Sequence, residues 1–329
     1  MGNFLRDQLR NIAPFATLIA LVVLFSVLSP SFATLGNLTN VLQQISVTAI
    51  IATGLTFVIL CAEIDLSVAS VANAVGIAVA WFTLQDPSSV NIANIPLPGW
   101  AGILAAIAFA GGLGLVNAFG ITVIGIPSFI MTLAMLQIGT GLCSILVRGQ
   151  IAYAVPGPIE TLGGGSIHGV PWLVIVAVIV LAVGHIVLTY TRFGRYVYMT
   201  GGNREAADYS GVNTRRIVGA VMVISAVCSG LAGMLGVAHF GSAQSGEFDN
   251  YLLDSISAVV VGGTSLFGGQ GGIGNTIVGL FVLGVLNNGL DHVSIDSFLK
   301  ILIRGLILLL ALVMNVYAQR LRARTAVAV

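Results

Sequence analysis

Long runs of apolar residues are the feature that most constrains the fold of this chain. A helix needs about 20 predominantly apolar residues to cross a bilayer, and ten runs among the 329 residues approach or reach this length. Charged residues make up only 8% of the chain, compared with about 25% in a soluble protein. We therefore expect an all-α polytopic membrane protein that forms a single transmembrane domain over residues 1–329.

About ten membrane-spanning helices are expected. The eighth run, 252–264, is too short to cross the bilayer as a straight apolar helix, so we expect a half-helix or a re-entrant element there. Such an element is tolerated only where protein surrounds it. Eight crossings would leave both termini on the same side, as ten crossings do. The ten ranges are 12–29, 41–62, 65–84, 100–123, 128–147, 171–190, 216–238, 252–264, 273–290 and 298–317.

The basic residues orient this bundle. Cytoplasmic loops of membrane proteins carry an excess of Lys and Arg. Ten crossings from a cytoplasmic N-terminus put ten of the thirteen basic residues on cytoplasmic segments. Both termini and the loop 191–215 are then cytoplasmic. The segments 85–99 and 148–170 are nearly free of Lys and Arg and are expected outside.

A polar segment within the loop 191–215 is predicted to form a short capped helix. Asn203 is a good N-cap, Glu205 falls in the first turn, and Gly211 is placed to end the helix. Arginines flank the segment at positions 192, 195, 215 and 216. We interpret it as a docking element on the cytoplasmic face, the alternative being an ordinary helical loop. The candidate coupling residues are Gly201, Gly202, Asn203, Arg204, Glu205, Ala206, Ala207, Asp208 and Gly211.

Two carboxylates, Glu63 and Asp65, lie between two apolar spans. Charges at membrane depth are costly and are usually functional or paired. Asp65 and Ser67 are therefore candidates for a solute pathway. The alternative is a cytoplasmic turn in which Asp65 or Ser67 caps the next helix, and one residue can serve both purposes.

Asparagines inside apolar helices add further pathway candidates, namely Asn73, Asn117 and Asn287, with Asn288 beside the last. Interhelical hydrogen bonding is the common reason for such residues. The alternative is that each of these asparagines lines a hydrated path for the solute.

The outer end of the last span carries a cluster of charges. Asp291, His292 and Asp296 precede Lys300 and Arg304, whose spacing of four residues puts both bases on one helix face. The cluster either anchors the outer end of the last span by local ion pairs or contacts an extracytoplasmic partner.

Short stretches in the two halves of the chain have similar sequences. The stretch 114–117 (GLVN) resembles 284–287 (GVLN), and 65–67 (DLS) has a loose counterpart at 254–257 (DSIS). Transporters are often built from internal repeats, so an internal inverted repeat is possible here.

Several functional classes lack their signatures. The glycine-rich run 268–274 is not a phosphate-binding loop, because such a loop needs Gly-Lys-Ser/Thr after its glycines and the only lysine is Lys300. No nucleophile–base pattern or His-Glu-x-x-His motif occurs, so no catalytic residues are assigned. The scattered cysteines and histidines predict no metal site. A net charge of +1 gives no case for nucleic-acid binding.

Five motifs occur in this order along the chain: EIDLSV at 63–68, PSFIMTL at 127–133, TRFGR at 191–195, GGNREAA at 201–207 and VGGTS at 261–265. Together they resemble the ribose/xylose/arabinose-type permeases of bacterial ABC importers. The resemblance covers residues 12 to 318. It departs from the usual pattern at 251–254, where relatives commonly read Tyr-Glu-Leu-Asp, and at Ala62-Glu63, where Gly-Gly is common.

The resemblance implies a permease in the bacterial inner membrane that pairs with a second permease chain. A separate cytoplasmic ATP-binding subunit would hold ATP and Mg and would dock on the helix at 203–211. A periplasmic binding protein would deliver a monosaccharide, so this chain needs no cofactor of its own. Candidate contacts with that binding protein are Arg148, Asp254, Lys300 and Arg304.

Other functions remain open from the sequence. A permease for branched-chain amino acids or nucleosides is the nearest alternative. An ion-coupled secondary transporter would need a coupling-ion site at mid-membrane, and a membrane enzyme would show turnover without a partner. The sequence does not identify the solute.

Overall fold

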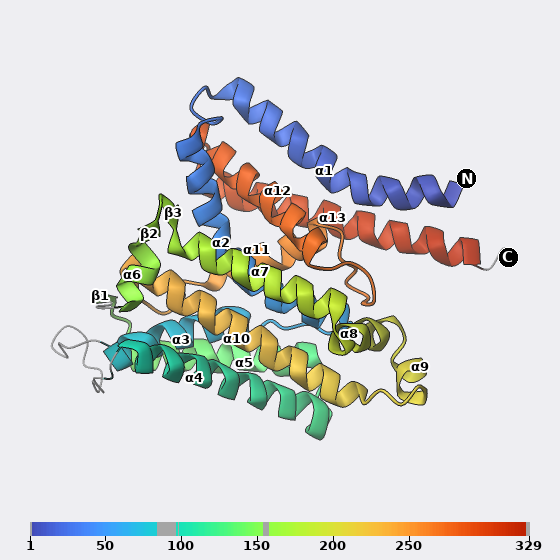
Figure 1. Cartoon of the computed structure of the whole chain (residues 1–329), viewed down its shortest axis with the longest axis horizontal. Helices are drawn as coiled ribbons and strands as arrows, with labels where there is room; N and C mark the ends of the chain where they lie inside the picture. The colour runs from blue at the N-terminus through green and yellow to red at the C-terminus, as the bar shows by residue number, and fades with distance from the viewer. Residues whose placement is uncertain (1, 84–96, 98, 154–157, 327–329) are drawn as a thin grey trace.

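The computed structural model describes residues 2–83, 97, 99–153 and 158–326, and over these ranges the chain is a bundle of helices (Figure 1). Each of the ten predicted spans coincides with one helix, which supports the all-α polytopic class. The helices are α1 (Gly2–Leu28), α2 (Leu35–Leu60), α3 (Val68–Thr83), α4 (Gly99–Phe119), η1 (Gly120–Ile124), α5 (Ser128–Leu146), α6 (Pro158–Gly164), α7 (Trp172–Tyr190), α8 (Arg192–Gly202), α9 (Arg204–Tyr209), α10 (Thr214–Phe240), α11 (Asp249–Val261), α12 (Ile273–His292) and α13 (Ser297–Ala326).

Six helices among the described residues are long and apolar enough to cross a membrane: α2, α4 with its π-helical extension η1, α5, α7, α10 and α12. The ranges Pro14–Leu28 of α1 and Val68–Ala80 of α3 are shorter apolar helices. The chain is thus a multi-pass membrane protein, and the count of ten crossings stays a prediction.

The eighth predicted run forms the short helix that its length indicated. Helix α11 has 13 residues, about 20 Å at 1.5 Å per residue, against the ~30 Å of a bilayer core. Its C-terminus leads into the glycine-rich stretch 262–272, which contains no helix. The internal repeat stays a prediction.

Small strands and an additional helix lie between α5 and α7, where the sequence indicated only a loop. The antiparallel pair β2 (Ser166–Ile167) and β3 (Val170–Pro171) follows α6. The strand β1 (Ala152–Tyr153) pairs with β4 (Ser242–Ala243), which follows α10. These two-residue ladders join loops and leave the all-α class unchanged.

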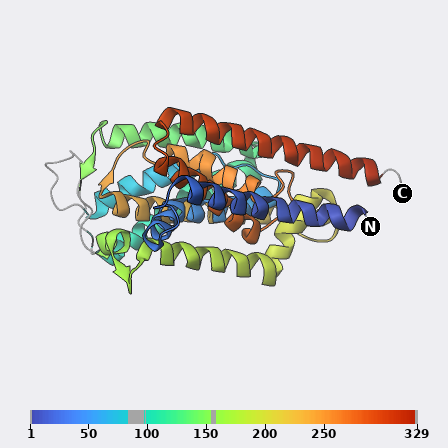
Figure 2. The same cartoon turned by 90° about the horizontal axis from the view of Figure 1, so that it is seen from above.

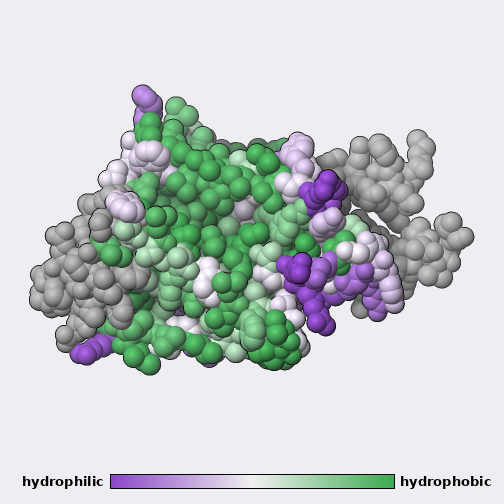
Figure 3. Space-filling view, turned by 60° about the horizontal axis from the view of Figure 1, so that its bottom comes forward, coloured by the Kyte–Doolittle hydropathy of each residue, from purple (hydrophilic) through white to green (hydrophobic). Residues whose placement is uncertain are grey.

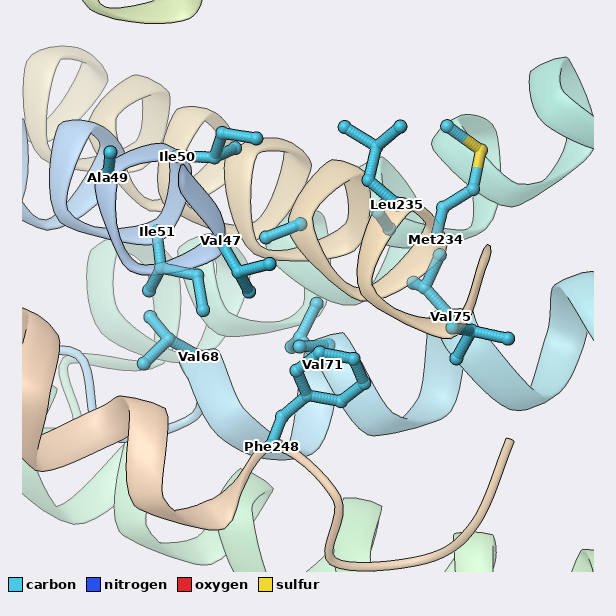
Figure 4. Packing of buried hydrophobic residues seen from close by; sticks show 14 of the residues in the cluster. Val47, Ala49, Ile50, Ile51, Val68, Val71, Val75, Met234, Leu235 and Phe248 are labelled. Carbon is cyan, nitrogen blue, oxygen red and sulfur yellow. The ribbon is translucent and has the colours of Figure 1, made fainter. Parts of the chain in front are cut away.

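Helix α10 is the centre of the packed core and lies against α2, α3 and α4. Figure 4 shows Val71 of α3 beside Phe248, the residue preceding α11, and Ile51 of α2 beside Val68 of α3, and all four are almost fully buried. Small residues bring the helices close: a Cβ at Gly54 would lie 2.8 Å from the Cα of Ser225 on α10. Close backbone approach of this kind is the usual basis of helix packing in membranes, where lipid is as apolar as leucine.

The two ends of the bundle differ. The ends of α1 and α13 that carry the chain termini lie at the same end as α8 and α9, whereas α6 and strands β2 and β3 lie at the other (Figures 1 and 2). The face seen in Figure 3 is hydrophobic over its middle and hydrophilic toward the end that carries the termini. This arrangement suits a protein that crosses a bilayer along the long axis of the bundle.

Candidate functional site

The predicted docking helix is present as α9 and is capped as the sequence indicated. The side chain of Asn203 accepts a hydrogen bond from the backbone N–H of Ala206, at 3.0 Å, which satisfies one of the free N–H groups of the first turn. Glu205 lies in that first turn, where a carboxylate complements the positive end of the helix dipole. Most of the helix is exposed.

Gly211 ends this region with a φ of 82°, in the left-handed range that favours glycine. Its N–H donates to the carbonyl of Asp208, and the N–H of Val212 donates to the carbonyl of Ala207. Together these two bonds form a Schellman motif. Val212 and Ala207 are both buried in the same apolar cluster, so their packing also stabilises the C-terminal end of the helix. Asp208 also accepts a hydrogen bond from the hydroxyl of Thr214, at 2.8 Å, at the start of α10.

A second helix, α8, precedes α9 and was not predicted. Thr191 is its N-cap, with its hydroxyl accepting from the N–H of Gly194 at 3.2 Å. The signal in the sequence is this threonine directly before a polar run, which sequence reading treated as plain loop. The docking segment is therefore a pair of short helices rather than one.

The end of α8 packs tightly against the rest of the chain. A Cβ at Gly201 would overlap the carbonyl oxygen of Leu60, the last residue of α2, whereas a Cβ at Gly202 would meet no atom within 4 Å. Gly269 donates its N–H to the same Leu60 carbonyl, at 2.9 Å, and Tyr198 of α8 donates its hydroxyl to the carbonyl of Gly271, at 2.9 Å. Helix α8 is thus held to both α2 and the glycine-rich loop.

An ion pair joins α9 to the turn after α2. Arg204 binds Glu63, and the Glu63 side chain is mostly buried while that of Arg204 is half exposed. The preceding residue, Ala62, has a φ of 59°, a conformation that costs a non-glycine residue about 1–2 kcal/mol. A glycine, which the permease pattern favours here, would avoid this strain.

The pathway candidates Asp65, Ser67 and Asn117 lie together in a buried hydrogen-bond network. The carboxylate of Asp65 accepts from the backbone N–H of Ser67 at 2.9 Å and from its hydroxyl at 2.6 Å. The other carboxylate oxygen accepts from the hydroxyl of Ser225 on α10, at 2.7 Å. Asn117 of α4 donates to the Ser67 hydroxyl at 2.9 Å. The network ties the start of α3 to α4 and α10.

Asn73 has a different position, beside the start of α11. Its amide donates to Asp249 at 2.9 Å, and its carbonyl oxygen accepts from the backbone N–H of Phe248 at 3.1 Å. This is the interhelical hydrogen bonding that is common for such residues.

A polar cavity of about 640 Å³ lies among α2, α11, α12 and α13. On the α2 side, the lining residues recur at helical spacing. The facing side combines carboxylates, amides and one guanidinium. Its polar lining residues are Asn40, Gln43, Gln44 and Thr48 of α2, His239 of α10, Glu247, which precedes α11, Asn250, Tyr251 and Asp254 of α11, Asn287 and Asp291 of α12, and Arg304 of α13.

Asn287, Asp254 and Arg304 meet at this cavity. The Nε of Arg304 donates to the Oδ1 of Asn287 at 2.7 Å, and its Nη1 lies 3.3 Å from the Oδ2 of Asp254. The sequence had assigned Asn287 to the solute pathway and the other two residues to contact with a partner. The structure places all three around one space.

The other two predicted contacts lie elsewhere. Lys300 pairs with Asp291. Arg148 is exposed after the end of α5, with a φ of 51°.

The amide row of α2 was missed in the sequence. Asn40, Gln43 and Gln44 occupy positions i, i+3 and i+4, which lie on one helix face. The signal was available, because three amides at this spacing are unusual at the start of an apolar span.

The described residues contain no group of three or more His, Cys, Asp or Glu side chains that could hold a metal ion. What the arrangement offers is a rigid, capped surface at one end and a polar cavity in the body of the bundle. Neither feature positions a nucleophile beside a base.

Comparison with known proteins gives a consistent result. The family model described as "Branched-chain amino acid transport system / permease component" matches residues 37–312. The chain is 35% identical to the ribose import permease protein of Escherichia coli (strain K12), over 91% of each chain. It is 30% identical to the D-allose transport system permease protein of the same strain, over 92% of this chain and 90% of that one. It is 32% identical to the L-arabinose transport system permease protein, over 95% and 92%. No solved structure matches the chain.

Proposed function

The chain belongs to the family of permease components of the branched-chain amino acid transport type, and from its similarity to the named ribose, allose and arabinose permeases we propose that it imports a monosaccharide. Members of this family are transport permeases, so the chain is a transport protein and not an enzyme. In the proposed system it is the transmembrane subunit of an ATP-binding-cassette importer in the bacterial inner membrane. The named ribose, allose and arabinose permeases support the sugar class.

The polar cavity is the observation that carries the choice of a sugar over a branched-chain amino acid. A branched-chain amino acid presents an apolar side chain together with an ammonium and a carboxylate. The cavity offers a row of neutral amides, and its one arginine already binds Asp254 and Asn287. Amides bind hydroxyl groups well because they supply both donors and an acceptor, and carboxylates accept hydrogen bonds from hydroxyl groups.

The α8–α9 pair is the proposed docking surface for the ATP-binding subunit, with residues 201–208 and 211 at its centre. The caps make α9 a stiff element. The contact of Gly201 with Leu60 and the ion pair of Arg204 with Glu63 would transmit a movement of the two helices to α2 and α3. In the proposed orientation this end of the bundle and both termini are cytoplasmic, as the arginine distribution favours. ATP and Mg²⁺ would reside on the partner subunit.

The remaining partners follow from the same proposal. A second permease chain completes the membrane unit, and a periplasmic binding protein delivers the sugar to the end that carries α6, with Arg148 and Lys300 as proposed contacts. Asn287 is proposed to line the sugar's route. Asp65, Ser67, Asn73 and Asn117 are proposed to affect transport by holding α3, α4, α10 and α11 in register.

Reconstitution tests this function. The purified chain is placed in proteoliposomes with its ATP-binding subunit and binding protein, and uptake of labelled D-ribose, D-allose, L-arabinose and L-leucine is measured. We expect uptake of at least one sugar that requires ATP and the ATP-binding subunit. Sugar uptake that persists without that subunit and follows an ion gradient would show a secondary transporter. ATP-dependent uptake of leucine but of no sugar would overturn the substrate class.

A further inference from the structure

We propose that the cavity among α2, α11, α12 and α13 is a selectivity site on the permease itself, which binds an uncharged monosaccharide between the α2 amide row and the Arg304–Asn287–Asp254 cluster. The inference rests on the proposed function and goes further by naming the residues that contact the sugar. It also assigns Asp254 the role of masking the arginine charge.

The α2 wall is built to hydrogen-bond a solute. Asn40 and Gln44 are exposed and Gln43 is half-buried, and all three face the cavity. The structure shows no hydrogen bond from their side chains to any other described residue. Amides within an apolar span are costly unless water or a solute binds them. The row therefore offers three free amides at helical spacing.

The opposite wall is preorganised. Arg304 holds Asn287 and Asp254 from two different helices, so three polar side chains are fixed around one guanidinium. Tyr251 contributes an aromatic ring to the same wall, and that ring lies against the ring of Phe248 at a centroid distance of 5.6 Å. An aromatic face next to fixed hydrogen-bonding groups suits the C–H face and hydroxyl edge of a sugar ring.

The charges around the cavity disfavour an anionic solute. Asp254 offsets the positive charge of Arg304, and Lys300 offsets Asp291. Glu247, whose carboxylate accepts a hydrogen bond from Gln244, leaves the wall with an excess of negative charge. An anionic sugar finds no free cation here and meets repulsion from Glu247. Hydroxyl groups can still donate to each of these carboxylates.

Thiol protection tests the site directly. In a background in which Cys61, Cys143 and Cys228 are replaced by alanine, Gln44→Cys is introduced and the rate of its reaction with a hydrophilic maleimide is measured on the purified full chain. We expect millimolar D-ribose, D-allose or L-arabinose to slow labelling at least threefold, and L-leucine to leave the rate unchanged. The matched control is Leu35→Cys, on the opposite face of α2 and 86% exposed, where no sugar should change the rate.

The outcomes separate this inference from the proposed function. If no sugar protects Gln44→Cys while the wild-type complex imports sugar, the cavity is not the binding site and the function stands. If leucine protects and sugars do not, the substrate class fails together with the inference. Equal protection at Gln44→Cys and Leu35→Cys would indicate a non-specific effect and overturn the inference as well.

Two further substitutions in the Gln44→Cys background test the named roles. Asn287→Leu removes one hydrogen-bonding group, so the sugar concentration for half-protection should rise about threefold to tenfold, as expected for one neutral hydrogen bond. Asp254→Asn keeps the size of the side chain and unmasks Arg304, so D-ribonate should gain protection that it lacks in the parent. If D-ribonate still gives none and D-ribose protects as before, Asp254 does not mask the arginine.

Discussion

Gly201 and Gly202 are adjacent in the sequence but have opposite surroundings. Gly201 faces the backbone of Leu60, and Gly202 faces open space. The sequence assigned both to coupling for the same reason, their place before the capped helix. The structure shows that only Gly201 is required by packing, which makes the pair a matched experiment at the scale of single residues.

Gly201→Ala is expected to destabilise the chain, and Gly202→Ala is not. A Cβ at position 201 would have to displace a main-chain carbonyl, and overpacking of this kind costs about 1–3 kcal/mol. At position 202 alanine gains helix propensity, worth at most about 1 kcal/mol. Thermal unfolding in detergent should show a lower midpoint for the first variant only. Equal midpoints for the two variants would contradict the close contact with Leu60.

The Arg204–Glu63 ion pair is expected to couple α9 to the membrane helices. Glu63→Arg and Arg204→Glu should each raise the ratio of ATP hydrolysed to sugar imported, because each replaces attraction by repulsion. The double charge swap should restore most of that ratio. The pair is partly exposed, so about 0.5–1 kcal/mol of coupling energy is expected. Co-purification of the ATP-binding subunit is measured in parallel, and strictly additive effects would mean that the two residues act independently.

At the scale of the element, α9 depends on its two ends more than on its length. With six residues it is too short to be stable as an isolated helix. The N-cap Asn203 stabilises one end of the helix. Gly211 and the packed pair Ala207 and Val212 stabilise the other end. Substitutions at the caps should therefore affect docking more than substitutions on the exposed face.

Gly211→Val is predicted to uncouple the complex, with Glu205→Lys having a smaller effect. A β-branched residue tolerates the left-handed conformation poorly, at about 1–2 kcal/mol or more. Gly211→Asn is the control, since asparagine tolerates this region better. Co-purification of the ATP-binding subunit and sugar-stimulated hydrolysis should fall for valine and be largely kept for asparagine. If the valine and lysine variants both dock and hydrolyse normally, α9 is not the coupling element.

At the scale of the whole molecule, the two ends of the bundle should face different compartments. Ser210 follows α9 and Ser166 lies in β2, and both are exposed at opposite ends of the bundle. With cysteine at each position in a cysteine-free background, an impermeant thiol reagent on intact cells should label position 166 and spare position 210. The reverse pattern would invert the orientation and, with it, the proposed docking side.

The sequence by itself determined the class of the protein and the local features of its docking helix. Long apolar runs predict helices because a helix satisfies its backbone hydrogen bonds within one segment, as a bilayer requires, and each predicted range contains a helix. The caps at Asn203 and Gly211 were predictable because capping depends on a few neighbouring residues. The short helix at 249–261 followed from the length of its apolar run.

Only the tertiary structure decided which polar residues meet. Asp65 and Ser225 are far apart in the chain, as are Asn287 and Asp254, and nothing in their local patterns indicates a shared site. Hydrogen-bond partners across helices depend on the rotation of each helix about its axis and on glycines that set its depth of packing. Both are properties of the packed bundle, which is why the sequence named Asn287, Asp254 and Arg304 separately but did not show that they meet.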